Sequence, residues 1–191
     1  MKLPKIFIKF AFSKYVKKFN KTHRRDKRFV DFNHVRSVLV LFESNLSENH
    51  KVVQSIIKDL TNEGKTVVAY GYVPKKKALT PSRLDFTLLD NEKTNCLLRP
   101  EKAVLEKIAE EKYDLLIDLT LRQVVPIDYI LVSANAKCKT GKKKTETSLT
   151  DFQIDIPKRK ALPDNEIDLN FCEERLLFDQ IIFYLKQITA K

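Results

Sequence analysis

Apolar residues between positions 35 and 73 change from a continuous run to a helical spacing and back again. The runs at 35–42 (VRSVLVLF) and 66–73 (TVVAYGYV) are rich in β-branched residues, which is typical of strands covered on both faces. Between them, apolar residues recur every three or four positions, with Ser47 placed to cap the start of a helix and Gly64 placed to end it. A strand, a helix and a second strand of these lengths form a right-handed β-α-β unit, in which the two strands run parallel.

The rest of the chain repeats this alternation of buried strands and amphipathic helices. Strands are predicted at 84–90, 113–120 and 137–140, the last of them stopped by Gly141, and an edge strand is predicted at 152–156. Helices are predicted at 100–112, 124–136 and 173–188. The pattern therefore predicts a Rossmann-like, three-layer α/β sandwich over residues 34–191, with a mostly parallel sheet of about five strands.

Small polar and charged side chains follow two of the predicted strands, at the edge where ligands collect in open parallel sheets. Six of them are candidate ligand-binding residues: Glu43, Ser44 and Asn45 after the first strand, and Asp118, Thr120 and Arg122 around the end of the strand YDLLIDLT. A carboxylate such as Asp118 beside Arg122 is suited to orienting a sugar hydroxyl or a phosphate. In the alternative interpretation, Asp118 and Ser44 only cap loops by hydrogen bonding to backbone amides.

Residues 1–33 differ from the rest of the chain in charge. The 191-residue chain has a net charge of +11, and residues 1–28 account for +10 of it, with eleven Lys and Arg and a single acid, Asp26. A set of apolar residues shares one side of a helical wheel, namely Ile8, Ala11, Phe12, Tyr15, Val16 and Phe19. The segment is therefore predicted to be a basic amphipathic helix and a polar connector, placed before the α/β domain.

Three roles fit this basic segment. It can lie on an anionic membrane, with its aromatic side chains among the acyl chains and its lysines over the headgroups. It can contact nucleic-acid phosphates, which is the less favoured alternative, or it can dock its apolar face on its own domain. In the first two cases the contacts would come from Lys9, Lys14, Lys17, Lys18, Lys21, Arg24, Arg25, Lys27 and Arg28.

The composition argues against several kinds of chemistry. Only three glycines occur, and neither a dinucleotide-binding motif nor a P-loop is present, so no nucleotide cofactor is expected. The three histidines have no partner at a meaningful spacing, no G-x-S-x-G motif occurs, and no cluster has metal-ligand spacing. Neither a catalytic residue nor a metal is therefore expected. Three widely spaced cysteines, and no apolar run of ~20 residues, predict a cytoplasmic protein without a membrane span.

Four stretches of the sequence resemble a family of uncharacterised Bacteroidota proteins, a domain of unknown function: SVLVLFESNLSENHKVVQSIIKDLTNEGKTVVAYGYV, EEKYDLLIDLTLR, VSANAKCKTG and FDQIIFYLKQI. The segment YDLLIDLT…SANAKCKTG is also similar to the amino-terminal half of lipopolysaccharide heptosyltransferases, in which a Tyr-Asp strand, a helix and an Ala-Lys-Gly turn follow one another. This second resemblance implies a Rossmann-like fold. Such transferases hold the nucleotide sugar with a second Rossmann-like domain. The length of this chain leaves no room for one, which argues against independent transferase activity.

These observations favour a non-catalytic accessory or binding protein at the cytoplasmic face of the inner membrane, associated peripherally through residues 1–28. An alternative of a different class is a partial, glycosyltransferase-like enzyme that binds a sugar or phosphate ligand near Ser44, Asp118 and Arg122. The sequence indicates no particular ligand and no oligomeric state.

Overall fold

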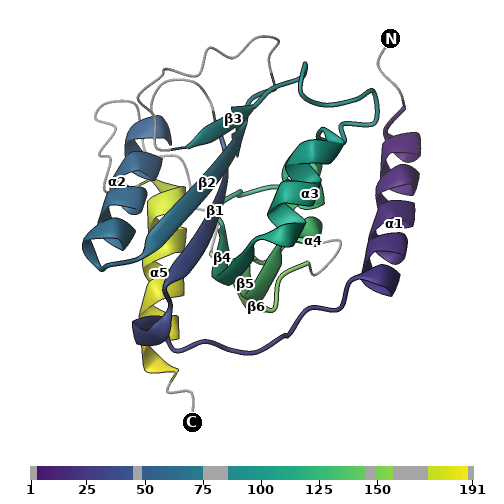
Figure 1. Ribbon diagram of the computed structural model, residues 1–191. Coiled ribbons are helices and arrows are strands. Elements are labelled where there is room, and N and C mark those ends of the chain that lie inside the picture. The colour runs from purple at the N-terminus through teal and green to yellow at the C-terminus, as the bar shows by residue number, and fades with distance from the viewer. Residues whose placement is uncertain (1–3, 45–48, 75–85, 145–148, 157–171, 189–191) are drawn as a thin grey trace, which may run out of the picture.

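The computed structural model describes residues 4–44, 49–74, 86–144, 149–156 and 172–188, and its centre is a six-stranded sheet (Figure 1). The strands are β1 (Ser37–Glu43), β2 (Thr66–Tyr72), β3 (Thr87–Leu89), β4 (Lys112–Asp118), β5 (Asn135–Lys142) and β6 (Phe152–Ile154). They lie in the order β3-β2-β1-β4-β5-β6, and every neighbouring pair is parallel. The predicted Rossmann-like α/β fold is confirmed, although the sheet has six strands rather than about five.

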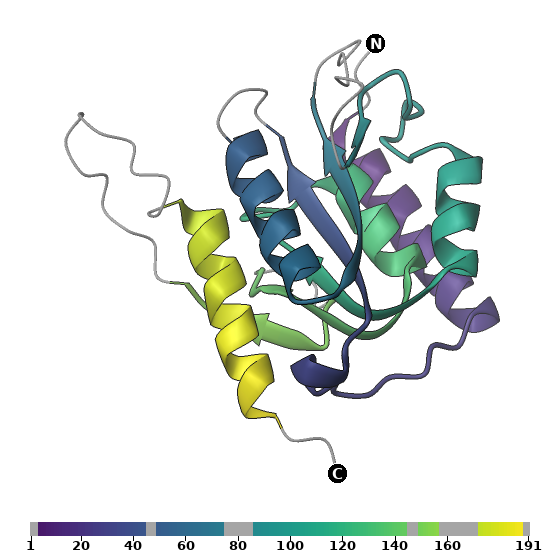
Figure 2. The same cartoon turned by 60° about the vertical axis from the view of Figure 1, so that its left-hand side comes forward.

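Helices cover both faces of this sheet (Figures 1 and 2). They are α1 (Lys5–Thr22), α2 (Asn49–Asn62), α3 (Lys102–Glu110), α4 (Val125–Ser133) and α5 (Glu173–Gln187), and a short 3-10 helix η1 (Phe32–His34) precedes β1. Helices α2 and α5 share a hydrophobic core with one face of the sheet, and α3 and α4 share a second core with the other face. Helix α1 packs on α4, outside the second face.

Neighbouring residues of β1 face opposite cores, which explains why this segment is apolar throughout. Val38 and Val40 belong to the core under α2 and α5, whereas Leu39 and Leu41 belong to the core under α3 and α4. All four side chains are fully buried. Burial of each stabilises the fold by roughly 1.5–3 kcal/mol. The loops at the carboxyl ends of the central strands therefore start from a rigid base.

The boundary between α4 and β5 differs from the prediction. The helix ends at Ser133 instead of continuing to 136, and β5 starts at Asn135 and runs through Gly141 to Lys142. Gly141 does not stop the strand, because it lies in register with Asp118 of β4. A Cβ atom at position 141 would lie 3.0 Å from the Asp118 carbonyl oxygen and 3.1 Å from the Asp118 Cβ. The glycine at this position is thus explained by a close approach between two strands.

Both edge strands agree with the sequence pattern. The strand predicted at 84–90 is β3, and the edge strand predicted at 152–156 is β6. Gly64 follows α2 with a φ of +76°, the left-handed conformation expected at the end of that helix. The predicted cap at Ser47 lies outside the described residues.

Helix α1 docks its aromatic side on α4. The ring of Phe12 packs edge-on against Tyr129 with centroids 5.0 Å apart, and the Tyr15 ring contacts the same tyrosine at 4.9 Å. The hydroxyls of Tyr15 and Ser133 are joined by a hydrogen bond of 2.7 Å. Phe19 is partly buried against the same core. The predicted amphipathic helix is confirmed, and its apolar stripe contacts the protein's own domain.

Candidate functional site

The two predicted site loops do come together at the carboxyl edge of the sheet. Strands β1 and β4 are neighbours, with Leu41 in register with Asp118. Arg122, predicted beside Asp118, instead binds Glu43 through two hydrogen bonds: Nε donates to Oε2 at 2.9 Å, and Nη2 donates to Oε1 at 2.5 Å. The Arg122 side chain is 72% exposed, so this ion pair lies at the rim of the edge.

Asp118 lies deeper, and its carboxylate is held by three donors. Thr120 donates to Oδ1 from its backbone nitrogen at 3.0 Å and from its hydroxyl at 2.6 Å. The ammonium of Lys144 donates to Oδ2 at 2.6 Å and to the Thr120 hydroxyl oxygen at 2.6 Å. Asp118 is fully buried, and Thr120 is nearly so. These contacts agree with the loop-capping interpretation and add a buried ion pair.

Asp128, in the first turn of α4, completes this cluster and was missed by the sequence analysis. Its Oδ1 lies 4.0 Å from the Lys144 ammonium, and its Oδ2 has no hydrogen-bond partner among the described residues. Burial raises the pKa of Asp128 to about 7, and Asp118 adds to the shift while Lys144 opposes it. An acid inside the otherwise apolar stretch VPIDYILVS was the available signal.

The remaining two predicted residues are Ser44 and Asn45, which follow Glu43 in the sequence. Ser44 is fully buried, and its backbone nitrogen donates to the carbonyl of Tyr72 at 2.9 Å, which extends the pairing of β1 with β2. Asn45 lies outside the described residues. Asp118, Thr120 and Lys144 therefore form a network whose polar groups bond to one another.

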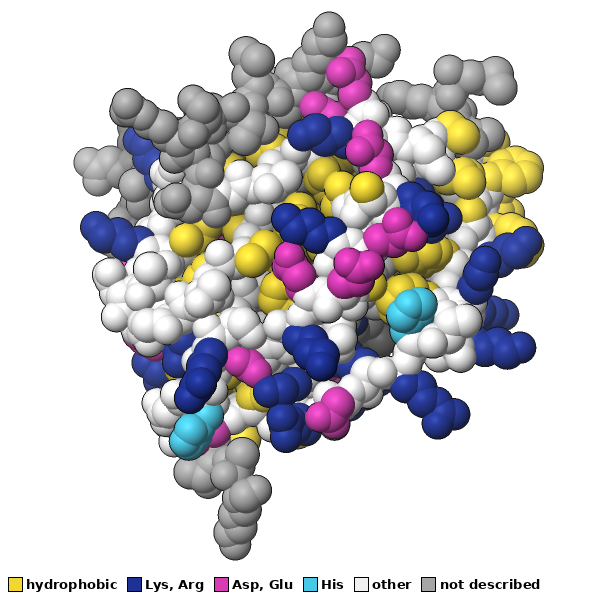
Figure 3. Space-filling model, in the orientation of Figure 1, with side chains coloured by type: hydrophobic (Ala, Val, Ile, Leu, Met, Phe, Trp, Pro, Cys, Tyr) yellow, Lys and Arg dark blue, Asp and Glu magenta, His cyan; other side chains and the backbone are white. Residues whose placement is uncertain are grey.

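The side of α1 that points away from α4 has a different character. Its outward face, defined here as Ile6, Phe7, Phe10, Lys14, Lys17 and Lys21, lies opposite Phe12 because a helix turns by 100° per residue. Three large apolar side chains are exposed on it: Ile6 by 72%, Phe7 by 57% and Phe10 by 70%. Figure 3 shows hydrophobic side chains at the amino-terminal end of α1 and basic side chains beyond them. The sequence contains no acid before Asp26.

The connector after α1 is fixed to β5 and β6. Arg25 donates to Asp151 through two hydrogen bonds of 2.6 Å and to the carbonyl of Ala136 at 2.8 Å. Arg25 is thus a bound side chain that is mostly buried. The other residues predicted to contact a membrane or a nucleic acid are exposed: Lys9, Lys14, Lys17, Lys18, Lys21, Arg24, Lys27 and Arg28.

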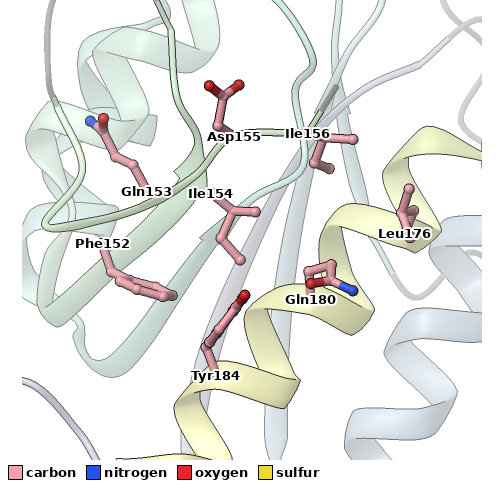
Figure 4. Close-up of a pocket in the computed structure, with 8 residues that line it drawn as sticks. All are labelled: Phe152, Gln153, Ile154, Asp155, Ile156, Leu176, Gln180 and Tyr184. Carbon is pink, nitrogen blue, oxygen red and sulfur yellow. The ribbon is translucent and has the colours of Figure 1, made fainter. Parts of the chain in front are cut away.

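Pockets lined by described residues lie at several places on the molecule, and three of them are compared. A groove of about 460 Å³ lies between β6 and α5, where Phe152 and Tyr184 face each other (Figure 4). A pocket of about 430 Å³ lies beside the connector, near Asp114. The largest of the three, about 720 Å³, lies between the carboxyl-terminal half of α1 and the end of α4. No group of His, Cys, Asp or Glu suited to a metal ion occurs in the described ranges.

Comparisons with known proteins give one match. The sequence model of a family described as a family of unknown function (DUF6913) matches residues 6–188, which include both α1 and the sheet. No curated protein and no solved structure gives a significant match. The expectation of a domain of unknown function is confirmed. The similarity to heptosyltransferases is not shown by these comparisons.

Proposed function

We propose that the protein, which belongs to this family of unknown function (DUF6913), is an accessory protein that binds anionic membrane surfaces through the outward face of α1. One observation carries the proposal. Three large apolar side chains are exposed at the start of a helix whose other face is already docked on the domain. Solvated apolar side chains on a docked helix add little to the stability of the fold, and the lysines beside them have no acid on the same helix.

The arrangement matches the physical requirements of interfacial binding. Ile6, Phe7 and Phe10 can enter the boundary between headgroups and acyl chains, while Lys14, Lys17 and Lys21 face the headgroups. Each lysine near an anionic leaflet contributes about 1 kcal/mol, and the attraction falls off within a Debye length. The proposal thus transfers the membrane contact from the aromatic stripe, which packs on α4, to the opposite side of the same helix.

Peripheral association on the cytoplasmic face is the form of binding that we propose. Among the described residues, no helix is both long enough and apolar enough to cross a bilayer. The outward face is short, with three apolar side chains, so the expected affinity is modest and depends on lipid charge.

Vesicle flotation tests this proposal with variants that change only exposed side chains. We expect the protein to float with vesicles that contain phosphatidylglycerol. We expect it to stay in the bottom fraction when the vesicles are pure phosphatidylcholine. A variant carrying Ile6→Ser, Phe7→Ser and Phe10→Ser is expected to lose at least ten-fold in binding. The matched control is Phe183→Ser with Tyr184→Ser, which removes exposed rings from α5 and is expected to bind as the wild type does. Equal binding to neutral vesicles, or unchanged binding of the triple variant, would overturn the proposal.

Two sets of variants distinguish nucleic-acid binding by the same segment from membrane binding. A charge-reversal variant of Lys14, Lys17 and Lys21 to Glu weakens binding to both vesicles and nucleic acid. The apolar triple variant weakens binding to vesicles alone, because phosphate contacts depend on charge and on salt concentration. If gel-shift affinity for RNA or DNA exceeds vesicle affinity and survives the apolar substitutions, the nucleic-acid role replaces the membrane role.

A further inference from the structure

The largest described pocket has an unusual charge content. It lies between α1 and the connector on one side and the end of α4 and start of β5 on the other, and it has a volume of about 720 Å³. Its basic lining residues are His23, Arg24, Arg25, Lys27 and Lys139, and none of the described residues that line it is an Asp or a Glu. Its apolar lining residues include Val16 and Phe19 of α1 and also Leu149.

We propose that this cleft binds an organic phosphate, with the phosphate among the basic side chains and an attached apolar group against Val16, Phe19 and Leu149. The volume falls within the range of small-molecule sites, ~300–1,000 Å³. This site is distinct from the outward face of α1, and it does not depend on the proposed membrane binding.

The arginine and lysine side chains of the connector carry more positive charge than the nearby carboxylate neutralises. Arg25 is paired with Asp151 at 2.6 Å, and Lys27 lies 3.8 Å from the same carboxylate. Arg24 is exposed and forms no ion pair within the part of the chain that the structure describes. One carboxylate is therefore shared by two cations, and Arg24 adds a further positive charge to the cleft. A phosphate can accept the remaining donors, and arginine suits its geometry because two N–H groups can bond to two oxygens.

Lys139 also lines the cleft and is almost completely buried. Its ammonium donates to the carbonyls of Leu131 at 2.5 Å and Val132 at 3.2 Å, at the carboxyl end of α4. The pKa of Lys139 is lowered to about 7, mainly by burial; Arg25 and Lys27 contribute to the lowering, and Asp151 opposes it. A bound anion would favour the charged form of this lysine and offset the repulsion among the cations.

Calorimetric titration of the full chain tests the site with soluble probes. We expect phenyl phosphate to bind at least ten-fold more tightly than inorganic phosphate, and phenol to show no binding. Arg24→Ala with Lys27→Ala is expected to weaken phenyl phosphate binding at least ten-fold. The matched control, Lys51→Ala with Lys58→Ala, removes two exposed cations from α2 and should leave binding unchanged. Equal affinity of the cleft variant and the wild type, or no binding of either phosphate by the wild type, would overturn the proposal.

A second variant tests the location without removing charge. Asn20 is exposed and lines the cleft, so Asn20→Trp places an indole in the apolar part and is expected to abolish phenyl phosphate binding. Unchanged binding by Asn20→Trp would refute the assigned cleft. The apolar triple variant of the outward face should bind phenyl phosphate normally, so failure of the membrane proposal and failure of this one are distinguishable. Dihexanoyl phosphatidic acid below its micelle concentration, compared with phenyl phosphate, distinguishes a lipid source from a soluble one.

Discussion

The carboxyl edge of the sheet and the α1 side of the molecule both carry charged residues, but they differ in how those charges are matched. At the carboxyl edge, the buried Asp118 accepts hydrogen bonds from Thr120 and Lys144. On α1 the first acid of the chain comes only at Asp26, so the lysines of the outward face have no acid on their own helix. One region balances its charges inside the fold, and the other keeps an excess of one sign at the surface.

This difference separates a residue's position in the fold from its availability to a ligand. Asp118 ends the central strand, where the α/β architecture favours binding, yet its oxygens are already bonded to internal donors. A ligand would first have to break a buried ion pair, at a cost of several kcal/mol. Uncompensated charge at an exposed or partly open surface is the stronger indication of binding. It favours α1 and the cleft beside it.

The largest expected effect comes from removing the cation of the carboxyl edge. Lys144→Met leaves Asp118 and Asp128 buried without their counter-charge, so we expect the free energy of unfolding to fall by about 3–5 kcal/mol. Chemical denaturation at pH 8 measures the loss. Lys143→Met, at the exposed neighbouring position, is the control and should stay within about 0.5 kcal/mol of the wild type. If Lys144→Met were as stable as the wild type, the network around Asp118 would be open to solvent. The contrast between the carboxyl edge and α1 would then not hold.

The two sides of α1 are compared by two phenylalanine substitutions. Phe12→Ala removes the ring that packs on Tyr129 and is expected to lower the free energy of unfolding by about 3 kcal/mol. Phe10→Ala, on the outward face, should change it by less than about 0.5 kcal/mol and should weaken vesicle binding instead. Denaturation and flotation on the same samples measure both. A comparable loss of stability in Phe10→Ala would show that the outward face is covered in solution.

Much of the fold was predictable because the periodicity of apolar residues changes clearly between elements. The β1-α2-β2 unit follows from runs at 35–42 and 66–73 and from the helical spacing between them. The end of α4 was not predictable in this way. The segment from Val124 to Cys138 is apolar on nearly every side, and Lys139, a polar residue by sequence, is buried in the strand that follows.

The candidate site was predictable in part for a related reason. The edge of the sheet that carries Asp118 and Thr120 follows from the strand order of an α/β fold. Lys144, however, lies 26 residues from Asp118 and belongs to a run of three lysines that look alike in the sequence. Which of the three lysines enters the core depends on the path that the chain takes after the end of β5. That geometry is a property of the folded chain and has no local sequence signal.

A smaller effect, with a definite pH dependence, is expected for Asp128→Asn. The folded-state pKa of about 7 lies above the ordinary value of 3.8, so between these values the folded state holds a proton that the unfolded state lacks. The wild type therefore loses stability as the pH rises through this window. Since one pKa unit corresponds to about 1.4 kcal/mol, the shift of about three units makes ionisation of Asp128 cost roughly 4 kcal/mol at pH 8. The Asn amide is itself a buried polar group and retains part of this cost, so we expect Asp128→Asn to be more stable than the wild type by about 2 kcal/mol at pH 8. The gain should disappear at pH 4. A gain of equal size at both pH values would contradict the assignment.

The smallest effect is expected for Arg122→Ala, which removes the ion pair at the rim of the same edge. The pair has good two-point geometry, but Arg122 is 72% exposed, so water and salt screen most of the attraction. We expect a loss below about 1 kcal/mol that shrinks further in 1 M salt, measured by denaturation beside Lys144→Met. The two substitutions remove ion pairs of similar length from one edge, so their difference measures the effect of burial. If Arg122→Ala cost as much as Lys144→Met, burial would not be what closes the carboxyl edge. Asp118 would then regain its place as the leading ligand-binding residue.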